Sequence, residues 1–259
     1  MAYTHRELRE AFHLQFLSRL LKLSDPRLYV LKGGANLRFF HGSPRYSEDM
    51  DLDVLGGAVS TLRKNGYRVL SDAAFRRSLA ALGVVDVEVN DPGRAKHTPT
   101  TQRFRARVVT AAGEALPTKV EFSRRRQDAA SQAIVTGTVS PDRTGRYRQL
   151  AFQCQHYSGH AQAEQKLAAL VGRSEPQVRD VFDLYVLWLG GHWDDTVGRT
   201  LPEHVRTRAA DLLVSFSYAD YVDQVVDYLD PESRADYEGV DRWNDICAAL
   251  IDLLDEGDT

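Results

Sequence analysis

The chain has 259 residues, enough for one large domain or two small ones. Hydrophobic residues make up 43% and charged residues 27%, a balance typical of a globular protein with a proper core and not of a disordered chain. The formal net charge of −3 excludes a general attraction for nucleic acid, so any such contact requires a local basic patch.

Charge near the N-terminus argues against a targeting segment. The stretch MAYTHRELREAFHLQ carries charged residues where a signal peptide needs an apolar core. No run of about eighteen apolar residues, the length that spans a bilayer, occurs in the sequence. We therefore expect a cytoplasmic protein with no membrane partner.

The first half of the chain is predicted to mix helices and strands. Apolar residues at helical spacing predict an amphipathic helix over residues 5–23. A short strand at 28–31 leads to a helix at 35–41, which Gly42, Ser43 and Pro44 end. The elements predicted next are a strand at 49–54, helices at 58–65 and 72–82, and strands at 84–90, 104–110 and 117–122.

The character of the sequence changes around residue 140. From Gln162 to the end, apolar and aromatic residues recur at three-to-four spacing, which is typical of helices. We predict an α/β (α+β) domain with a small mixed sheet over residues 1–140 and a helical region over 141–259.

Three acids at alternate positions mark the predicted strand at 49–54. Asp49, Asp51 and Asp53 share one strand face, while Met50 and Leu52 face the core. Like charges on one face raise the pKa of at least one carboxyl group unless a cation lies between them. Mg²⁺ takes hard oxygen ligands, often carboxylates together with substrate phosphates. A metal site is therefore predicted, although an acidic strand face is also compatible with simple solvation.

Two features next to this strand suit a nucleotide. Gly33 and Gly34 follow an apolar strand where a helix begins, so backbone N–H groups can approach a phosphate closely. Ser47 precedes Asp49 by two residues. Its hydroxyl is predicted either to contact a nucleotide phosphate or to shape the turn into the strand.

The glycine pair, the spacer and the Asp-x-Asp pattern, in this order, resemble the nucleotidyltransferase superfamily of the DNA polymerase beta palm. The string GGANLRFFHGSPRYSEDMDLD resembles more closely the AbiEii/AbiGii abortive-infection toxins, which include the MenT-type tRNA-modifying toxins. That family pattern is Lys-Gly-Gly, an amphipathic helix, Arg-aromatic-Ser and Asp-x-Asp-Leu-Asp. The matching residues here are Lys32-Gly33-Gly34, Arg45-Tyr46-Ser47 and Asp49-Met50-Asp51-Leu52-Asp53.

The resemblance implies a third carboxylate on a neighbouring strand, so that three acids hold two metal ions. Glu121, in the predicted strand KVEF, is the main candidate, with Glu88 and Asp53 as alternatives. A surface ion pair of Glu121 with Lys119 or Arg124 remains the other interpretation. The basic triplet that follows is predicted to hold RNA phosphates, or else is merely solvated; it consists of Arg124, Arg125 and Arg126.

A second motif, AEQKLAALVGRSEPQVRDVFDLY at residues 163–185, extends the resemblance. Lys166 is predicted to open a helix and to neutralise charge on a leaving pyrophosphate. Asp180 and Asp183 are three residues apart and so share a helix face. Asp180 is predicted to anchor Lys166 or Arg179, or to position the substrate hydroxyl. The alternative is a salt-bridged helix surface.

Taken together, the resemblance implies a polymerase-beta-like nucleotidyltransferase core whose active-site cleft the C-terminal helices complete. The implied activity is Mg²⁺-dependent transfer of a nucleoside monophosphate from an NTP to the 3′ end of tRNA. The implied role is that of a toxin with a cognate antitoxin, in a toxin-antitoxin or abortive-infection system. A protein or small-molecule acceptor, and an inactive RNA-binding or partner-binding module, remain open.

In some relatives an antitoxin kinase phosphorylates the serine that corresponds to Ser47. Such a phosphate would add about two negative charges beside the metal site and block NTP binding. The preferred NTP and the oligomeric state are open.

Overall fold

The computed structural model describes residues 3–93, 95, 97–124, 133–193 and 201–255. The chain forms two compact units. The N-terminal unit consists of residues 1–40 and 46–157, and the C-terminal unit of residues 41–45 and 158–259. The division after residue 157 differs from the predicted boundary at 140, because the last strands of the sheet follow residue 133.

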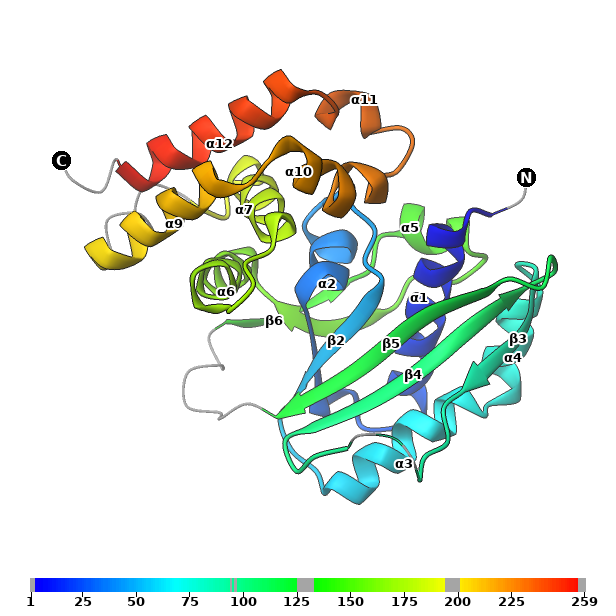
Figure 1. Ribbon diagram of the computed structural model, residues 1–259. Coiled ribbons are helices and arrows are strands. Elements are labelled where there is room, and N and C mark those ends of the chain that lie inside the picture. The colour runs from blue at the N-terminus through cyan, green and yellow to red at the C-terminus, as the bar shows by residue number, and fades with distance from the viewer. Residues whose placement is uncertain (1–2, 94, 96, 125–132, 194–200, 256–259) are drawn as a thin grey trace. The chain divides into compact units, whose positions relative to one another are not determined.

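The N-terminal unit contains every strand among the described residues (Figure 1). Its elements are α1 (His5–Leu23), η1 (Pro26–Leu28), β1 (Tyr29–Lys32), α2 (Gly33–Phe40), β2 (Asp49–Val54), α3 (Val59–Leu70), α4 (Ala73–Ala80), β3 (Val84–Val89), β4 (Thr101–Thr110), β5 (Ala115–Arg124), β6 (Ile134–Thr138), α5 (Pro141–Arg146) and β7 (Gln153–Tyr157).

The strands form one mixed sheet in the order β3-β4-β5-β2-β1-β7-β6. β2 pairs with β5 in parallel and with β1 antiparallel, and β1 pairs with β7 in parallel. The outer pairs β3–β4, β4–β5 and β6–β7 are antiparallel. The acidic strand β2 therefore lies at the centre of the sheet. The prediction of an α/β fold with a mixed sheet is confirmed.

Helices α1, α3 and α4 contact one another and cover one face of the sheet. Phe12, Phe16, Phe75, Phe104 and Phe122 are fully buried in this core. Burial of apolar surface on this scale is the main term that stabilises such a domain. The other face of β4, β5 and β2 is not covered by these helices and carries their polar side chains.

Helix α1 has the predicted bounds and begins at a capping box formed by Thr4 and Glu7. It is not simply amphipathic, however, because buried residues surround most of its circumference. Glu10, for example, is buried and accepts hydrogen bonds from Arg38 and Tyr147. The prediction of an amphipathic helix was wrong, because polar residues of other elements cover the side that was expected to face solvent. Helical periodicity in the sequence does not reveal such contacts.

A buried relay links α1 to the start of β2. The Thr118 hydroxyl donates to the carbonyl of Glu48 at 2.8 Å, so it accepts from His13 Nε2, also at 2.8 Å. Burial, with the nearby Arg9 charge, lowers the pKa of His13 from 6.5 to about 3. A neutral histidine therefore fixes the residue just before Asp49.

The strands β1 to β5 and helices α3 and α4 occur where the sequence predicted them, within three residues at each end except that α3 continues to Leu70, five residues beyond its predicted end. Helix α2 begins at Gly33, two residues earlier than expected. Strands β6 and β7 and helix α5 were not predicted. β7 carries the polar sequence QCQHY, which lacks the apolar alternation that a strand at the interior of a sheet usually shows.

The C-terminal unit is helical in the described residues, which confirms the helical pattern expected after Gln162. Its elements are α6 (Gly159–Gly172), α7 (Val178–Leu189), α9 (Glu203–Ser215), α10 (Tyr218–Gln224), η3 (Val226–Tyr228), α11 (Arg234–Tyr237) and α12 (Val240–Asp255). Across the parts of the chain that the structure describes, no helix combines the length and apolar character needed to cross a bilayer.

The His13 relay gives a pH-dependent stability. Below pH 6.5, His13 is protonated in the unfolded chain but stays neutral in the folded protein. The free energy of unfolding therefore falls as the pH falls toward 3. At pH 5 the loss from this group is on the order of 2 kcal/mol relative to neutral pH.

His13→Gln, which keeps an N–H donor for Thr118, should remove this part of the decline in urea unfolding curves. His160→Gln, at an exposed site, is the control. A His13→Gln protein with the wild-type decline would contradict this explanation.

Candidate active site

Asp49, Asp51 and Asp53 project from one face of β2, as the sequence predicted. Met50 and Leu52, between them, are completely buried on the opposite face. The alternation holds because successive side chains of a strand point to opposite sides. The three carboxylates therefore lie on the sheet face that α1, α3 and α4 leave uncovered.

Strand register places charged neighbours beside each of these acids. Asp51 is aligned with Glu121 on β5 and with Lys32 on β1. Asp49 is aligned with Lys119 on β5, which in turn is aligned with Arg105 on β4. Neighbouring strands are roughly 4.8 Å apart, so aligned side chains on one face are in contact range.

Basic side chains hold the acids in place. Lys119 Nζ lies 3.1 Å from Asp49 Oδ2 and 4.0 Å from Glu121 Oε2. Arg103 Nε donates to the same Glu121 oxygen at 2.7 Å, and Ser123 donates to the other at 3.3 Å. The ammonium of Lys119 thus lies within ion-pair range of two carboxylates from neighbouring parallel strands.

Asp53 differs from the other two aspartates. It is buried, Lys32 Nζ lies 2.5 Å from its Oδ1, and the Tyr157 hydroxyl donates to its Oδ2 at 2.8 Å. Both carboxylate oxygens are therefore engaged in protein contacts. This arrangement suits a residue that fixes β1, β2 and β7 together better than one that binds a metal ion.

The pKa of Asp51 is raised above its usual value. Burial is the largest cause, and the nearby charges of Glu121 and Asp49 add to it, while Lys32 and Lys119 oppose it. The upward shift agrees with the expectation from the sequence, but loss of solvent contributes more than the repulsion that the sequence suggested. A divalent cation beside Asp51 would favour its charged form.

Of the candidates for the third carboxylate, Glu121 lies next to Asp51 on the adjacent strand. Glu88 lies on β3, and strands β4 and β5 separate it from β2. That separation corresponds to roughly 14 Å, too far for Glu88 to share an ion with Asp51. Glu88 instead faces Arg107, at 3.7 Å.

The donor set of Asp49, Asp51 and Glu121 fits a hard divalent cation. All three supply carboxylate oxygens, the ligands that Mg²⁺ prefers. Within the described ranges, no three His, Cys, Asp or Glu side chains converge closely enough to hold an ion as they stand. Lys119 lies between Asp49 and Glu121, and Arg103 pairs with Glu121 from β4, so metal binding requires these side chains to turn away.

Gly33 lies against the same acids. Its φ of +66° is in the left-handed region, and a Cβ at this position would lie 3.3 Å from Asp51 Oδ2. The positive φ strongly favours glycine here, and a Cβ would lie tightly against the Asp51 carboxylate. Gly34 follows in the first turn of α2, and the Ser47 hydroxyl donates to the carbonyl of Asp49 at 2.8 Å. In this state Ser47 shapes the turn into β2, and the phosphate contacts of all three stay predictions.

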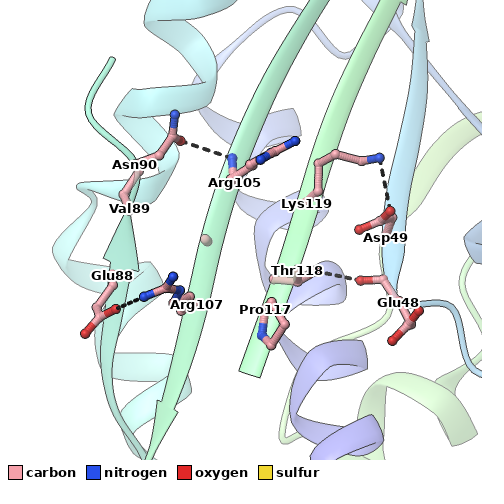
Figure 2. Close-up of a pocket in the computed structure, with 11 residues that line it drawn as sticks. Glu48, Asp49, Glu88, Val89, Asn90, Arg105, Arg107, Pro117, Thr118 and Lys119 are labelled. Carbon is pink, nitrogen blue, oxygen red and sulfur yellow. Dashed lines mark hydrogen bonds and ion pairs between the residues drawn. The ribbon is translucent and has the colours of Figure 1, made fainter. Parts of the chain in front are cut away.

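A groove of about 680 Å³ begins at this site and crosses β5 and β4 to β3. Figure 2 shows Lys119 pointing toward Asp49 at one end of the groove, and Arg107 pointing toward Glu88 at the other. Arg105 and Pro117 lie between them. This hollow and the acids belong to the same unit and to the same sheet face.

In the C-terminal unit, Lys166 is at the centre of a buried ionic cluster. Its ammonium lies 2.9 Å from Asp180 Oδ1 and 2.6 Å from Asp183 Oδ2, and both aspartates are 0% exposed. Arg173 also contacts Asp180, and Arg45 contacts Asp183 at 2.9 Å. Burial alone would raise the pKa of Asp183, but Arg45 and Lys166 outweigh it and lower that pKa.

These contacts decide several predictions about the second motif. Asp180 and Asp183 share one face of α7, as expected, and Asp180 does anchor Lys166. Lys166 does not open its helix, which was wrong; α6 begins at Gly159, where Ser158 caps it. A catalytic role for Lys166 and Asp180, and a cleft completed by the C-terminal helices, stay predictions.

Of the basic triplet, Arg124 lies among the described residues. The Arg124 guanidinium donates to the carbonyl of Gly57. Arg125 and Arg126 lie outside the described residues. RNA binding by this triplet therefore stays a prediction.

Sequence reasoning missed three residues that contact the acids: Lys119 as a partner of Asp49, Arg103 and Tyr157. The alternation of Lys119 and Glu121 along β5 was a usable signal, because it places both on one strand face. No signal in the sequence pairs Tyr157 with Asp53, since β7 itself was not recognisable.

The mixed sheet, with acids on two adjacent parallel strands, agrees with the nucleotidyltransferase fold expected from the sequence. A sequence model of the family described as nucleotidyl transferase AbiEii toxin, type IV toxin-antitoxin system, matches residues 15–242. The chain therefore belongs to this family and is a nucleotidyltransferase toxin of a type IV toxin-antitoxin system. Members of the family generally use a divalent metal. A comparison with curated protein sequences finds no significant match.

Two solved structures share this fold, and a third is a weaker match. JHP933 from Helicobacter pylori is similar over 99% of this chain and 96% of its own, with 17% identity and a TM-score of 0.57. A second H. pylori protein, described as a nucleotidyltransferase, matches 98% of this chain and 96% of its own, at 18% identity and a TM-score of 0.52. MenT4, a nucleotidyltransferase toxin from Mycobacterium tuberculosis, matches 93% of this chain and 92% of its own, with 16% identity and a TM-score of 0.47.

The ionic cluster predicts a large stability effect at Lys166. Lys166→Met would leave two fully buried carboxylates without their shared cation. Breaking such a buried pair costs about 3–5 kcal/mol, which urea unfolding would measure. Arg173→Met, which removes a cation with a 39% exposed side chain, is the matched control and should cost clearly less. Equal losses in the two variants would contradict a central role of Lys166 in the cluster.

Proposed function

We propose that this toxin transfers a nucleoside monophosphate from an NTP to the 3′ end of tRNA, with Mg²⁺ as cofactor. The observation that carries the proposal is the alignment of Asp51 on β2 with Glu121 on β5, with Asp49 on the same face. Acids on two adjacent strands are suited to hold metal ions around the phosphates of a nucleotide. Family membership supports the transferase class, and the acceptor follows from the resemblance to tRNA-modifying toxins.

In this proposal Asp49, Asp51 and Glu121 hold the metal, which supplies electrostatic stabilisation of the phosphate charges when it is bound. Gly33 and Gly34 offer backbone N–H groups to the triphosphate, as the start of α2 favours anions. Asp53, with Lys32 and Tyr157, keeps the acidic strand in position. Ser47 fixes the turn that leads into it.

The reaction balances without a further reactant. The acceptor hydroxyl oxygen forms a bond to the α-phosphorus, and the bond from that phosphorus to the bridging oxygen of the pyrophosphate breaks. The hydroxyl proton passes to a carboxylate of the same sheet face. The leaving pyrophosphate carries the displaced negative charge. From the motif around Lys166, we expect this lysine to neutralise that charge.

Two alternatives differ in the acceptor or in the chemistry. Transfer to a protein or small molecule would need the same acids but no RNA-binding surface. An inactive binding module would not need them, and the close approach of Gly33 to Asp51 favours an active site over that alternative. A type IV antitoxin is the expected biological partner, and phosphorylation of Ser47 would add charge beside Asp49.

Replacement of the metal-binding acids tests the proposal. The wild-type chain should label tRNA when incubated with total tRNA, Mg²⁺ and one radiolabelled NTP at a time. Asp49→Ala and Asp51→Ala should abolish labelling while circular dichroism stays unchanged. Asp86→Ala, at an exposed site on β3, is the control and should label normally.

Growth provides an independent readout. Production of the wild-type chain should arrest a bacterial host, whereas the Asp49→Ala chain should not. Full labelling by Asp49→Ala would refute the metal assignment. Absence of label in tRNA with every NTP, together with normal growth, would refute the tRNA acceptor.

A further inference from the structure

The groove that runs from Asp49 to β3 extends well beyond the proposed metal-binding acids. It has a volume of about 680 Å³, and its charged lining has basic groups in the middle and acidic groups at both ends (Figure 2). The basic ones are Arg105, Arg107 and Lys119, and the acidic ones are Glu48, Asp49 and Glu88. A groove of this size, next to a carboxylate of the proposed metal site, is large enough for an extended polar ligand.

The basic side chains of the groove follow the strand register. Arg105 on β4 is aligned with Lys119 on β5, and Lys119 with Asp49 on β2. Arg107 lies two residues further along β4 on the same face, roughly 7 Å from Arg105. A row of cations therefore leads away from the proposed metal site in regular steps.

Two of these cations are available to a ligand. Arg105 is exposed and forms no ion pair with any described residue. Arg107 lies 3.7 Å from Glu88, and their side chains are 64% and 53% exposed. Ion pairs this exposed contribute little to stability, so a phosphate can displace Glu88 at small cost.

The charge of the groove depends on the metal. Three basic and three acidic groups balance one another, so the groove is neutral before a divalent ion binds. A divalent ion at Asp49 would leave the groove positive and would release Lys119 toward it. The groove therefore becomes attractive to a polyanion when the site is ready to react.

We propose that this groove binds the single-stranded phosphodiester backbone of the RNA acceptor, immediately before the terminal nucleotide that receives the transfer. Arg105 and Arg107 contact the phosphates, and Lys119 joins them once a metal ion replaces it at Asp49. Guanidinium groups suit phosphates because their planar donors form paired hydrogen bonds. This inference rests on the proposed function, since it takes RNA as the acceptor.

A charge-reversal series tests the groove with the full-length protein. Binding of a short fluorescein-labelled single-stranded RNA is followed by anisotropy, with Ca²⁺ in place of Mg²⁺ to prevent turnover. The double variant Arg105→Glu with Arg107→Glu should weaken RNA binding about tenfold or more and reduce the salt slope by roughly 1 to 2. Arg77→Glu, an exposed arginine on α4, is the matched control and should bind as the wild type does.

A gain of binding is the complementary arm, which misfolding cannot imitate. Glu88→Gln removes the anion that faces Arg107, so RNA binding should tighten by about two- to threefold, an effect the size of an exposed ion pair. Binding of a fluorescent NTP analogue should not change in any of these variants. A loss of NTP binding with unchanged RNA binding would mean that the groove holds the triphosphate, which would overturn the proposal.

The outcomes separate this inference from the proposed function. If the wild-type chain labels tRNA but the double variant binds RNA as well as the wild type, the groove assignment fails and the function stands. If the wild-type chain neither binds nor labels RNA, both fail together.

Discussion

The parallel, in-register pairing of β2 with β5 is the interaction on which the rest of the site depends. It aligns Asp51 with Glu121 and Asp49 with Lys119, so two acids of one strand meet one acid and one base of the next. A shift by one residue would turn Glu121 to the opposite sheet face, because side chains alternate along a strand. The buried relay from His13 through Thr118 to Glu48 joins the first helix, β5 and the residue before β2, and it opposes such a shift.

The same alignment creates an electrostatic conflict that the protein settles with basic neighbours. Burial raises the pKa of Asp51, and the acids around it raise it further, while Lys32 and Lys119 lower it. Lysine and arginine side chains thus hold the acids close together, and a bound divalent ion would replace them in neutralising the carboxylates. In the C-terminal unit the solution is similar, since Lys166, Arg45 and Arg173 balance two buried aspartates. Replacing such a cluster as a whole by apolar residues is often neutral for stability, whereas removing one partner is costly.

The sequence predicted the central strands and the acidic face well, because Asp49 to Val54 alternates strictly and the apolar positions fill a core. It placed Glu121 on a strand but left Glu88 and Asp53 open, since strand order is a long-range property that local periodicity does not contain. Once the order is known, Glu88 is too distant and Asp53 is already paired with Lys32 and Tyr157. Strand β7 was missed because its sequence, QCQHY, lacks the apolar alternation of an interior strand. Lys166 was recognised from its motif, but its position within α6 was not, because Ser158 caps the helix earlier.

The central claim is that β2 and β5 together form a divalent-metal site, and metal binding tests it most directly. Mn²⁺ can replace Mg²⁺ as a probe, and electron paramagnetic resonance counts the bound ions in the presence of a non-hydrolysable NTP analogue. We expect the wild-type chain to bind Mn²⁺, and Asp51→Asn and Glu121→Gln each to lose most of this binding. Glu88→Gln should retain it, because Glu88 lies three strands away from Asp51. Wild-type Mn²⁺ binding in Glu121→Gln, with loss of binding in Glu88→Gln, would contradict the account.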